Sequence, residues 1–113
     1  MWSNTIENKI IDSIRFVLDS GGTIIANDYG VKWNGKKWVY NNRSKKCCPF
    51  GAVLIKHQPS NPNIHESLFN ILNVDSIFLW DFLPAFDKSQ DIYLDYTVGG
   101  KVGRNIRKFL EKL

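Results

Sequence analysis

Two adjacent cysteines, Cys47 and Cys48, are the residues of this sequence whose side chains are most suited to covalent chemistry. They stand between Lys45-Lys46 and Pro49, at the expected start of a helix, and a helix N-terminus beside cations can lower a thiol pKa and favour the nucleophilic thiolate. Cysteine is also among the most buried residue types, and no spaced C-x-x-C motif accompanies the pair. Because a disulfide between neighbours closes a small strained ring, we expect reduced thiols with a structural role.

Metal binding and acid–base catalysis are less well supported than the structural role. His57 and His65 would complete a metal set with the cysteines, but adjacent cysteines lack the usual ligand spacing. The carboxylates Asp81, Asp87, Asp91 and Asp95 are surrounded by no catalytic motif. We therefore expect no cofactor, no metal and no enzyme. A concave pocket that gathers His57, a thiol or several carboxylates would argue for an enzyme.

A glycine-rich segment, Gly99-Gly100-Lys101-Val102-Gly103-Arg104, has the composition of a phosphate-binding loop. It matches neither G-x-x-x-x-G-K-[ST] nor G-x-G-x-x-G. Glycines in a helix interior either break the helix or let another helix approach closely, and we favour a packing role.

Charge is distributed in blocks along the 113 residues, although the net charge is +4. Residues 1–28 carry −2 and residues 66–100 carry −5, whereas residues 29–65 carry +7 without a single acid and the tail from Lys101 carries +4. Aromatic residues are interleaved with the bases of the second block. The candidate binding face comprises Lys32, Trp33, Lys36, Lys37, Arg43, Lys45 and Lys46.

An Asn34-Gly35 pair flanked by β-forming residues predicts a hairpin with a two-residue turn. This register pairs Trp33 with Lys36, Lys32 with Lys37, Val31 with Trp38 and Tyr29 with Tyr40. One face would then carry Tyr29, Val31, Trp38 and Tyr40 toward the core. The other would carry the like-charged Lys32 and Lys37, which must face water or an anionic partner, with Trp33 as the main exposed ring.

Five segments have the residue pattern of helices. The first begins at Ser3 or Asn4, with Glu7 in a capping-box arrangement, and ends at Gly21-Gly22. Cys48 is the expected cap of a second helix, Phe50–His57, and Asn61 or Asn63 is the expected cap of a third, whose apolar stripe is Ile64, Leu68, Ile71 and Leu72. Asp75 is the expected cap of an apolar central helix that Pro84 ends or kinks. The last segment opens at Ser89 or Asp91 and finishes in a basic amphipathic helix.

The sequence thus predicts a helix-dominated α+β fold in one domain over residues 1–113, with about five helices and one small β-hairpin or short antiparallel sheet around residues 23–40. No apolar run approaches the roughly 18 residues of a membrane span, and the N-terminus lacks a signal-peptide core, so we expect no membrane contact and a cytoplasmic location. Residues 68–82 resemble a helix-turn-helix in spacing, but acids occupy the recognition positions, and we interpret them as a helical hairpin of the core.

Two functions remain open from the sequence. The charge blocks favour a protein-interaction module whose basic hairpin meets an acidic protein surface or the acidic middle of a second copy. The alternative is nucleic-acid binding through Lys32, Trp33, Lys36, Lys37 and Arg43, helped by Arg104 and Arg107, in which rings stack on bases and cations contact phosphates.

Overall fold

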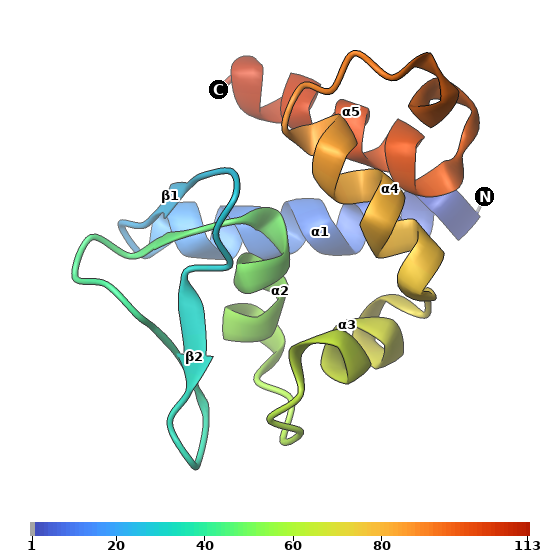
Figure 1. Ribbon diagram of the computed structural model, residues 1–113. Helices are drawn as coiled ribbons and strands as arrows, with labels where there is room; N and C mark the ends of the chain where they lie inside the picture. Colours follow the sequence, from blue (N-terminus) through green and yellow to red (C-terminus); the bar gives the residue numbers. More distant parts are fainter. Residues whose placement is uncertain (1) are drawn as a thin grey trace.

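The described part of the chain forms a helix-dominated α+β fold with five α-helices and two short two-stranded sheets (Figure 1). The computed structural model describes residues 2–113, with side chains from Thr5 onward. The elements in chain order are α1 (Trp2–Asp19), β1 (Thr23–Ile24), β2 (Val31–Trp33), β3 (Trp38–Tyr40), β4 (Lys46–Cys47), α2 (Pro49–His57), α3 (Ile64–Leu72), α4 (Ser76–Phe86), the 3-10 helix η1 (Ile92–Tyr96) and α5 (Val98–Glu111).

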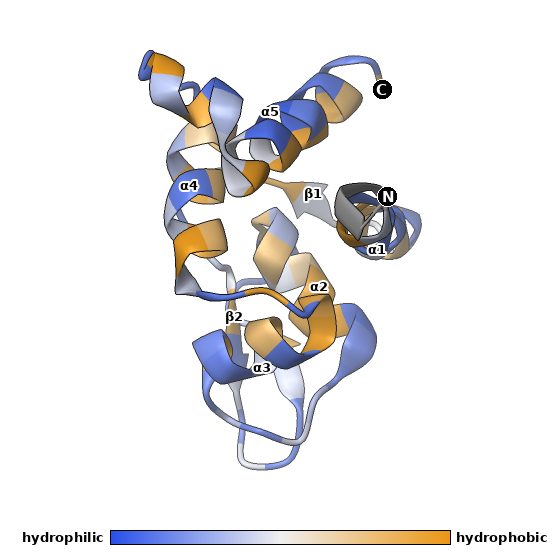
Figure 2. Cartoon of the chain, turned by 90° about the vertical axis from the view of Figure 1, so that its right-hand side faces the viewer, coloured by the Kyte–Doolittle hydropathy of each residue, from blue (hydrophilic) through white to orange (hydrophobic). Residues whose placement is uncertain are grey.

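The short helix α2 lies at the centre of the molecule. Its first seven residues, 49–55, are all buried, because the sequence PFGAVLI offers no polar face. In Figure 2 α2 is coloured as hydrophobic over most of its length and lies between α1, α3 and α4. Phe50 packs on Phe82 of α4 with ring centroids 4.5 Å apart, and the buried side of α1 covers α2 with Ile10, Ile14 and Val17.

Caps fix the starts of three helices as the sequence predicts. The Cys48 thiol accepts a hydrogen bond from Gly51 N, Asn63 Oδ1 accepts from Glu66 N, and Asp75 Oδ1 accepts from Phe78 N. Each bond satisfies a backbone donor that the first helical turn leaves unpaired. The predicted positions of α2, α3 and the start of α4 are therefore confirmed.

The predicted start of the first helix is wrong. Helix α1 already includes Trp2, so Ser3 and Asn4 lie inside it, and their side chains are outside the described residues. Glu7 serves the tertiary structure, since its Oε1 accepts a hydrogen bond of 2.8 Å from Asn105 Nδ2 of α5.

Helix α4 also differs from its predicted form. It continues past Pro84 to Phe86, and it is not buried all round, because Ile77 and Trp80 are 66% and 69% exposed. The predicted helical hairpin with α3 does not form, since α4 packs chiefly against α5. The aromatic residues of α4 therefore lie on two sides of the helix, one buried and one exposed to solvent.

Glycines allow α5 to pack closely on α4. A Cβ at Gly99 would lie 2.3 Å from the Phe78 carbonyl oxygen, and one at Gly103 would lie 2.7 Å from that of Phe82. The last segment is a short 3-10 helix followed by an α-helix that Thr97 caps through its hydroxyl oxygen. The packing interpretation of the glycine-rich segment is thus confirmed.

A parallel strand pair that the sequence does not predict joins Thr23 to Lys46 and Ile24 to Cys47. It is separate from the antiparallel hairpin of β2 and β3. Gly22 permits it, because a Cβ there would lie 2.7 Å from the Lys45 carbonyl oxygen. Among residues 2–113, no helix is long and apolar enough to cross a membrane.

We expect Gly99→Ala to lower the free energy of unfolding by about 1–3 kcal/mol, because the added methyl must push α4 and α5 apart. Helix propensity alone predicts the opposite sign, since alanine favours a helix over glycine. Urea denaturation checks this, with Lys101→Ala, an exposed position in the same helix, as the matched control. An unchanged midpoint for Gly99→Ala would contradict the close packing.

Candidate functional site

The hairpin has a different register from the predicted one. Val31 pairs with Tyr40, Lys32 with Val39 and Trp33 with Trp38, so the loop has four residues rather than two. Asn34 causes this difference: its Oδ1 accepts hydrogen bonds of 2.9 Å from both Lys36 N and Lys37 N. Its own N–H donates to the Lys37 carbonyl, which closes the loop at that residue.

The new register changes which side chains share a face. Val31, Trp33, Trp38 and Tyr40 now lie on one face, and Lys32 shares the opposite face with Val39. The like-charged pair of Lys32 and Lys37 predicted across the strands does not exist. Trp33 is half-buried and packs edge-on against Trp38 with ring centroids 5.8 Å apart, so the prediction of an exposed Trp33 ring is wrong.

A side-chain amide holds the hairpin on α2. Gln58 follows α2 with a left-handed backbone, φ +48°, and its Oε1 accepts a 2.8 Å hydrogen bond from Trp38 N. Its Nε2 donates to the Trp38 carbonyl oxygen, also at 2.8 Å. Gln58 thereby pairs with Trp38 as a neighbouring strand residue would, and it fixes the direction in which the hairpin leaves the core.

The seven residues of the predicted binding face occupy two places. Lys32, Trp33, Lys36 and Lys37 belong to the hairpin, whereas Arg43 and Lys45 lie between β3 and β4 and Lys46 begins β4. Figure 1 shows the hairpin loop at the bottom of the view and the β3–β4 connection at the left, at opposite ends of the hairpin. All six cations are exposed, and none forms an ion pair with a described residue. Lys45 Nζ donates to the Ser20 carbonyl at the end of α1, which gives that lysine a capping role.

The basic residues of α5 are in a different situation. Arg104 forms an ion pair with Asp95, and Arg107 pairs with Glu111 and donates to the Phe86 carbonyl. These two arginines link α5 to the segments that precede it. Their contribution to an anion-binding face alongside the hairpin is therefore not supported.

Exposed apolar side chains are concentrated on α4 and η1 and not on the hairpin. Among the described residues, five of the seven large exposed hydrophobic side chains lie on α4 and η1: Ile77, Trp80, Ile92, Tyr93 and Tyr96. The sequence does not predict this exposed side of α4, because the nearly continuous apolar run of residues 77–83 is typical of a buried helix. The acidic residues interspersed with these positions, Asp81, Asp91 and Asp95, were the available signal.

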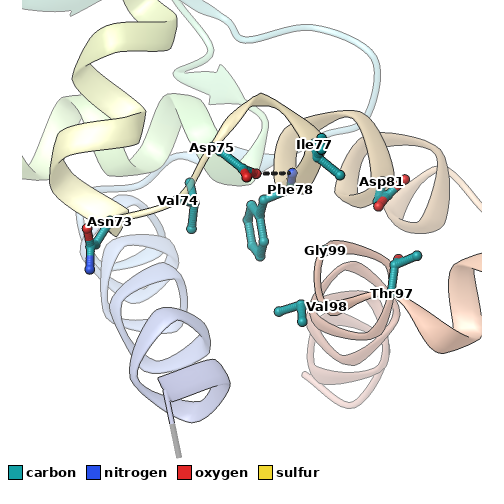
Figure 3. A pocket seen from close by; sticks show the side chains of 9 residues that line it. All are labelled: Asn73, Val74, Asp75, Ile77, Phe78, Asp81, Thr97, Val98 and Gly99. Atoms are coloured by element: carbon teal, nitrogen blue, oxygen red, sulfur yellow. Dashed lines mark hydrogen bonds between the residues drawn. The ribbon is translucent and has the colours of Figure 1, made fainter.

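A cleft of about 520 Å³ lies between the start of α4 and the start of α5. Figure 3 shows Phe78 and Val98 pointing into the space between the two helices, while the carboxylate of Asp75 is engaged as the cap of α4. The cleft also has Ile77 and Asp81 among its lining residues, together with Thr97, which directly follows Tyr96 of η1. It thus connects the exposed side of α4 with the end of η1.

A second pocket, of about 220 Å³, contains the combination that would favour an enzyme: the Cys48 thiol and the carboxylates Asp28 and Asp87, with Tyr29 beside them. Burial raises the pKa of Cys48 to about 11, although backbone N–H groups lower it, and the two carboxylates raise it further. Burial also raises the pKa of Asp87, and Arg107 opposes that shift. The thiol is therefore protonated at neutral pH and is not an activated nucleophile.

The Cys47 thiol is not an activated nucleophile either. It is fully buried, and burial together with the neighbouring Cys48 raises its pKa to about 12. Both thiols are free. The described residues contain no group of three or more His, Cys, Asp or Glu side chains placed to hold a metal ion. Cys48 acts as a helix cap and Cys47 as a core residue.

We expect both thiols to resist labelling by Ellman's reagent at pH 8 in the folded protein, because a pKa near 11 leaves about one thiolate per thousand molecules. Both should react fully after unfolding in guanidinium chloride. Free glutathione in the same buffer gives the reference rate for an ordinary thiol. Rapid labelling of either cysteine in the folded protein would contradict this account of the pocket.

Gln58→Ala should cost about 1–3 kcal/mol of stability, since it leaves the backbone N–H and C=O of Trp38 without partners. Amide hydrogen exchange should also accelerate at Trp38 and its strand neighbours. Gln90→Ala is the matched control, because Gln90 is exposed and its side chain makes no hydrogen bond among the described residues. Equal exchange rates in the two variants would show that Gln58 does not hold the hairpin.

The described residues therefore offer a basic hairpin, exposed rings with nearby carboxylates on α4 and η1, and a pocket lined by the Cys48 thiol. The chain matches no protein-family model, and it shows no significant similarity to a curated protein or to a solved structure.

Proposed function

We propose that this chain is a non-enzymatic protein-interaction module whose basic hairpin binds an acidic protein surface. One observation carries the proposal: the exposed cations of the hairpin lie on a different part of the molecule from the exposed aromatic rings of α4 and η1. Lys32, Lys36 and Lys37 are exposed on the hairpin. The exposed rings among the described residues are Phe16 on α1, Trp80 on α4, and Tyr93 and Tyr96 on η1.

Single-stranded nucleic acids are bound by rings that stack on bases beside cations that contact phosphates. On the hairpin, Trp33 packs against Trp38, and both Trp38 and Tyr40 pack against the core. The rings near the lysines are thus engaged within the molecule. Binding to a carboxylate-rich protein surface requires only the positive charge of the hairpin and no exposed ring. Complementary charge steers and orients such an encounter.

The unpaired state of the hairpin cations supports the same interpretation. The ion pairs of the described residues all lie within residues 88–111, and none reaches the hairpin. Three lysines within six residues repel one another, so an anionic partner relieves an unfavourable local field. The proposed binding residues are Lys32, Lys36 and Lys37, with Arg43 and Lys46 as more distant contributors.

The proposal also places the protein in the cytoplasm. Cys47 and Cys48 are free and adjacent, and a reducing compartment keeps such thiols reduced.

The test is a fluorescence-anisotropy titration with three labelled probes of matched charge: a glutamate-rich peptide, a single-stranded oligonucleotide and a double-stranded oligonucleotide. At about 50 mM salt, where surface charges are weakly screened, we expect the wild type to bind the peptide. Lys32→Glu/Lys36→Glu/Lys37→Glu should weaken this binding at least about tenfold, because each substitution turns an attraction into a repulsion. Raising the salt to about 500 mM should weaken it as well.

The control variant Lys101→Glu/Lys108→Glu/Lys112→Glu carries the same change of net charge on exposed positions of α5 and of its C-cap. It should keep most of the binding. Equal losses in the two variants would overturn the proposal, since the hairpin would then contribute no more than net charge. Tighter binding of the single-stranded oligonucleotide that Trp33→Ala abolishes would overturn it in favour of nucleic-acid binding.

A further inference from the structure

Here the α4–η1 face denotes a set of residues at or partly at the surface: Ile77, Trp80 and Asp81 of α4, Asp91 at the N-cap of η1, and Tyr93 and Tyr96 of η1. Its apolar members are strongly exposed: Trp80 by 69%, Ile77 by 66% and Tyr96 by 81%. Exposed aromatic side chains rimmed by polar residues are typical of protein-interaction surfaces. While these side chains are in water, the free energy that burial of their apolar surface would contribute is not gained.

The two parts of this face are held together through α5. Gly99 brings α5 against the carbonyl of Phe78, beside the Asp81 side chain, and Gly100 brings it against the carbonyl of Leu94 in η1. Leu94 is itself fully buried, so its neighbours Tyr93, Asp95 and Tyr96 are held at the surface. The face is therefore fixed by glycine contacts on both of its sides.

The charge of this face is the opposite of that of the hairpin. Residues 75–95 contain five aspartates and one lysine, whereas residues 29–65 contain seven bases and no acid. Asp95 is occupied by Arg104 and Asp75 by its own helix start, which leaves Asp81 and Asp91 as the carboxylates of the face without an ion pair among the described residues. A partner for this face should thus carry exposed cations.

The same chain carries both complementary surfaces, but one molecule cannot join them. The molecule is 39 Å long, and Figure 1 shows the hairpin loop at the bottom of the view and η1, coloured dark orange, at the top right. Two copies in opposite orientation can place each hairpin on the α4–η1 face of the other. In a two-fold symmetric dimer the hairpin–face contact forms twice, so both hairpins and both α4–η1 faces are covered.

From this complementarity we infer that the acidic partner of the hairpin is a second copy of this chain, and that its hairpin lysines dock on the α4–η1 face. The inference rests on the proposed function, because it names the surface that the basic hairpin binds. Lys36 and Lys37 at the loop meet Asp81 and Asp91, while the aliphatic lysine stems cover Trp80 and Tyr96.

A charge-swap experiment tests this pairing by sedimentation velocity at about 50 mM salt, where surface attraction is largest. The hairpin variant is Lys32→Glu/Lys36→Glu/Lys37→Glu, and the face variant is Asp81→Lys/Asp91→Lys. The wild type should dimerise, and each variant alone should dimerise at least about tenfold more weakly. An equimolar mixture of the two variants should regain a dimer, because one contact is then native and the other has both charges reversed.

Two controls separate surface contacts from net charge and from misfolding. Lys101→Glu/Lys108→Glu/Lys112→Glu should dimerise like the wild type, and all variants should show the helical circular-dichroism spectrum of the wild type. Trp80→Ser/Tyr96→Ser should weaken the dimer without changing its salt dependence, since it removes apolar contact and leaves the charges in place.

The outcomes distinguish this inference from the proposed function. A wild type that stays monomeric at millimolar concentration, yet still binds the glutamate-rich peptide through its hairpin, would overturn the second-copy partner and leave the proposed function standing. Dimers that form but fail to recover in the variant mixture would overturn the pairing of these two surfaces. Loss of peptide binding in the wild type would overturn the proposed function itself.

Discussion

Burial of α2 is the constraint on which the structure depends. Its residues 49–55 have no polar side chain, so the helix is stable in water only where other elements cover it on every side. Helix α1 covers one side, the hairpin and the parallel pair of β1 and β4 approach another, and Phe82 of α4 packs on Phe50. A nine-residue helix would be marginal in isolation, and here tertiary packing determines its stability.

The arrangement around α2 also determines what the surface presents. The hairpin must turn its apolar face, Val31, Trp38 and Tyr40, toward α2, and Gln58 at the end of that helix fixes its position. Its lysines consequently point to solvent without acidic neighbours. On the opposite part of the molecule, α4 uses Phe78, Phe82 and Phe86 for the core and for α5, which leaves Ile77 and Trp80 outside. The separation of cations from exposed rings thus follows from the packing.

Local signals in the sequence were sufficient for the fold class and for several boundaries. Cys48, Asn63 and Asp75 cap helices as predicted, because capping depends on side chains within three residues of the helix start. The hairpin itself was predictable from Asn34-Gly35, but its register was not. The Asn34 side chain bonds to two backbone amides of the loop, and this competes with the two-residue turn that the dipeptide usually forms.

Non-local contacts account for the remaining differences. The parallel pairing of Thr23 with Lys46 depends on a close approach at Gly22 that no short motif encodes. The exposed side of α4 depends on α5, which covers only the side of α4 that faces Gly99 and Gly103. Trp80 is exposed for the same reason. Trp33 instead packs on Trp38 because the hairpin register pairs the two residues.

The most direct measurement of the central claim is a ¹⁵N–¹H correlation spectrum recorded over a dilution series at low salt. If the cationic hairpin is a docking surface for the acidic face of a second copy, concentration-dependent shifts should concentrate at residues 32–37 and at residues 77–96 and should vanish at high salt. The basic tail of α5, at Lys108 and Lys112, should stay unchanged. Shifts spread evenly over the basic residues, or confined to α5, would contradict the account.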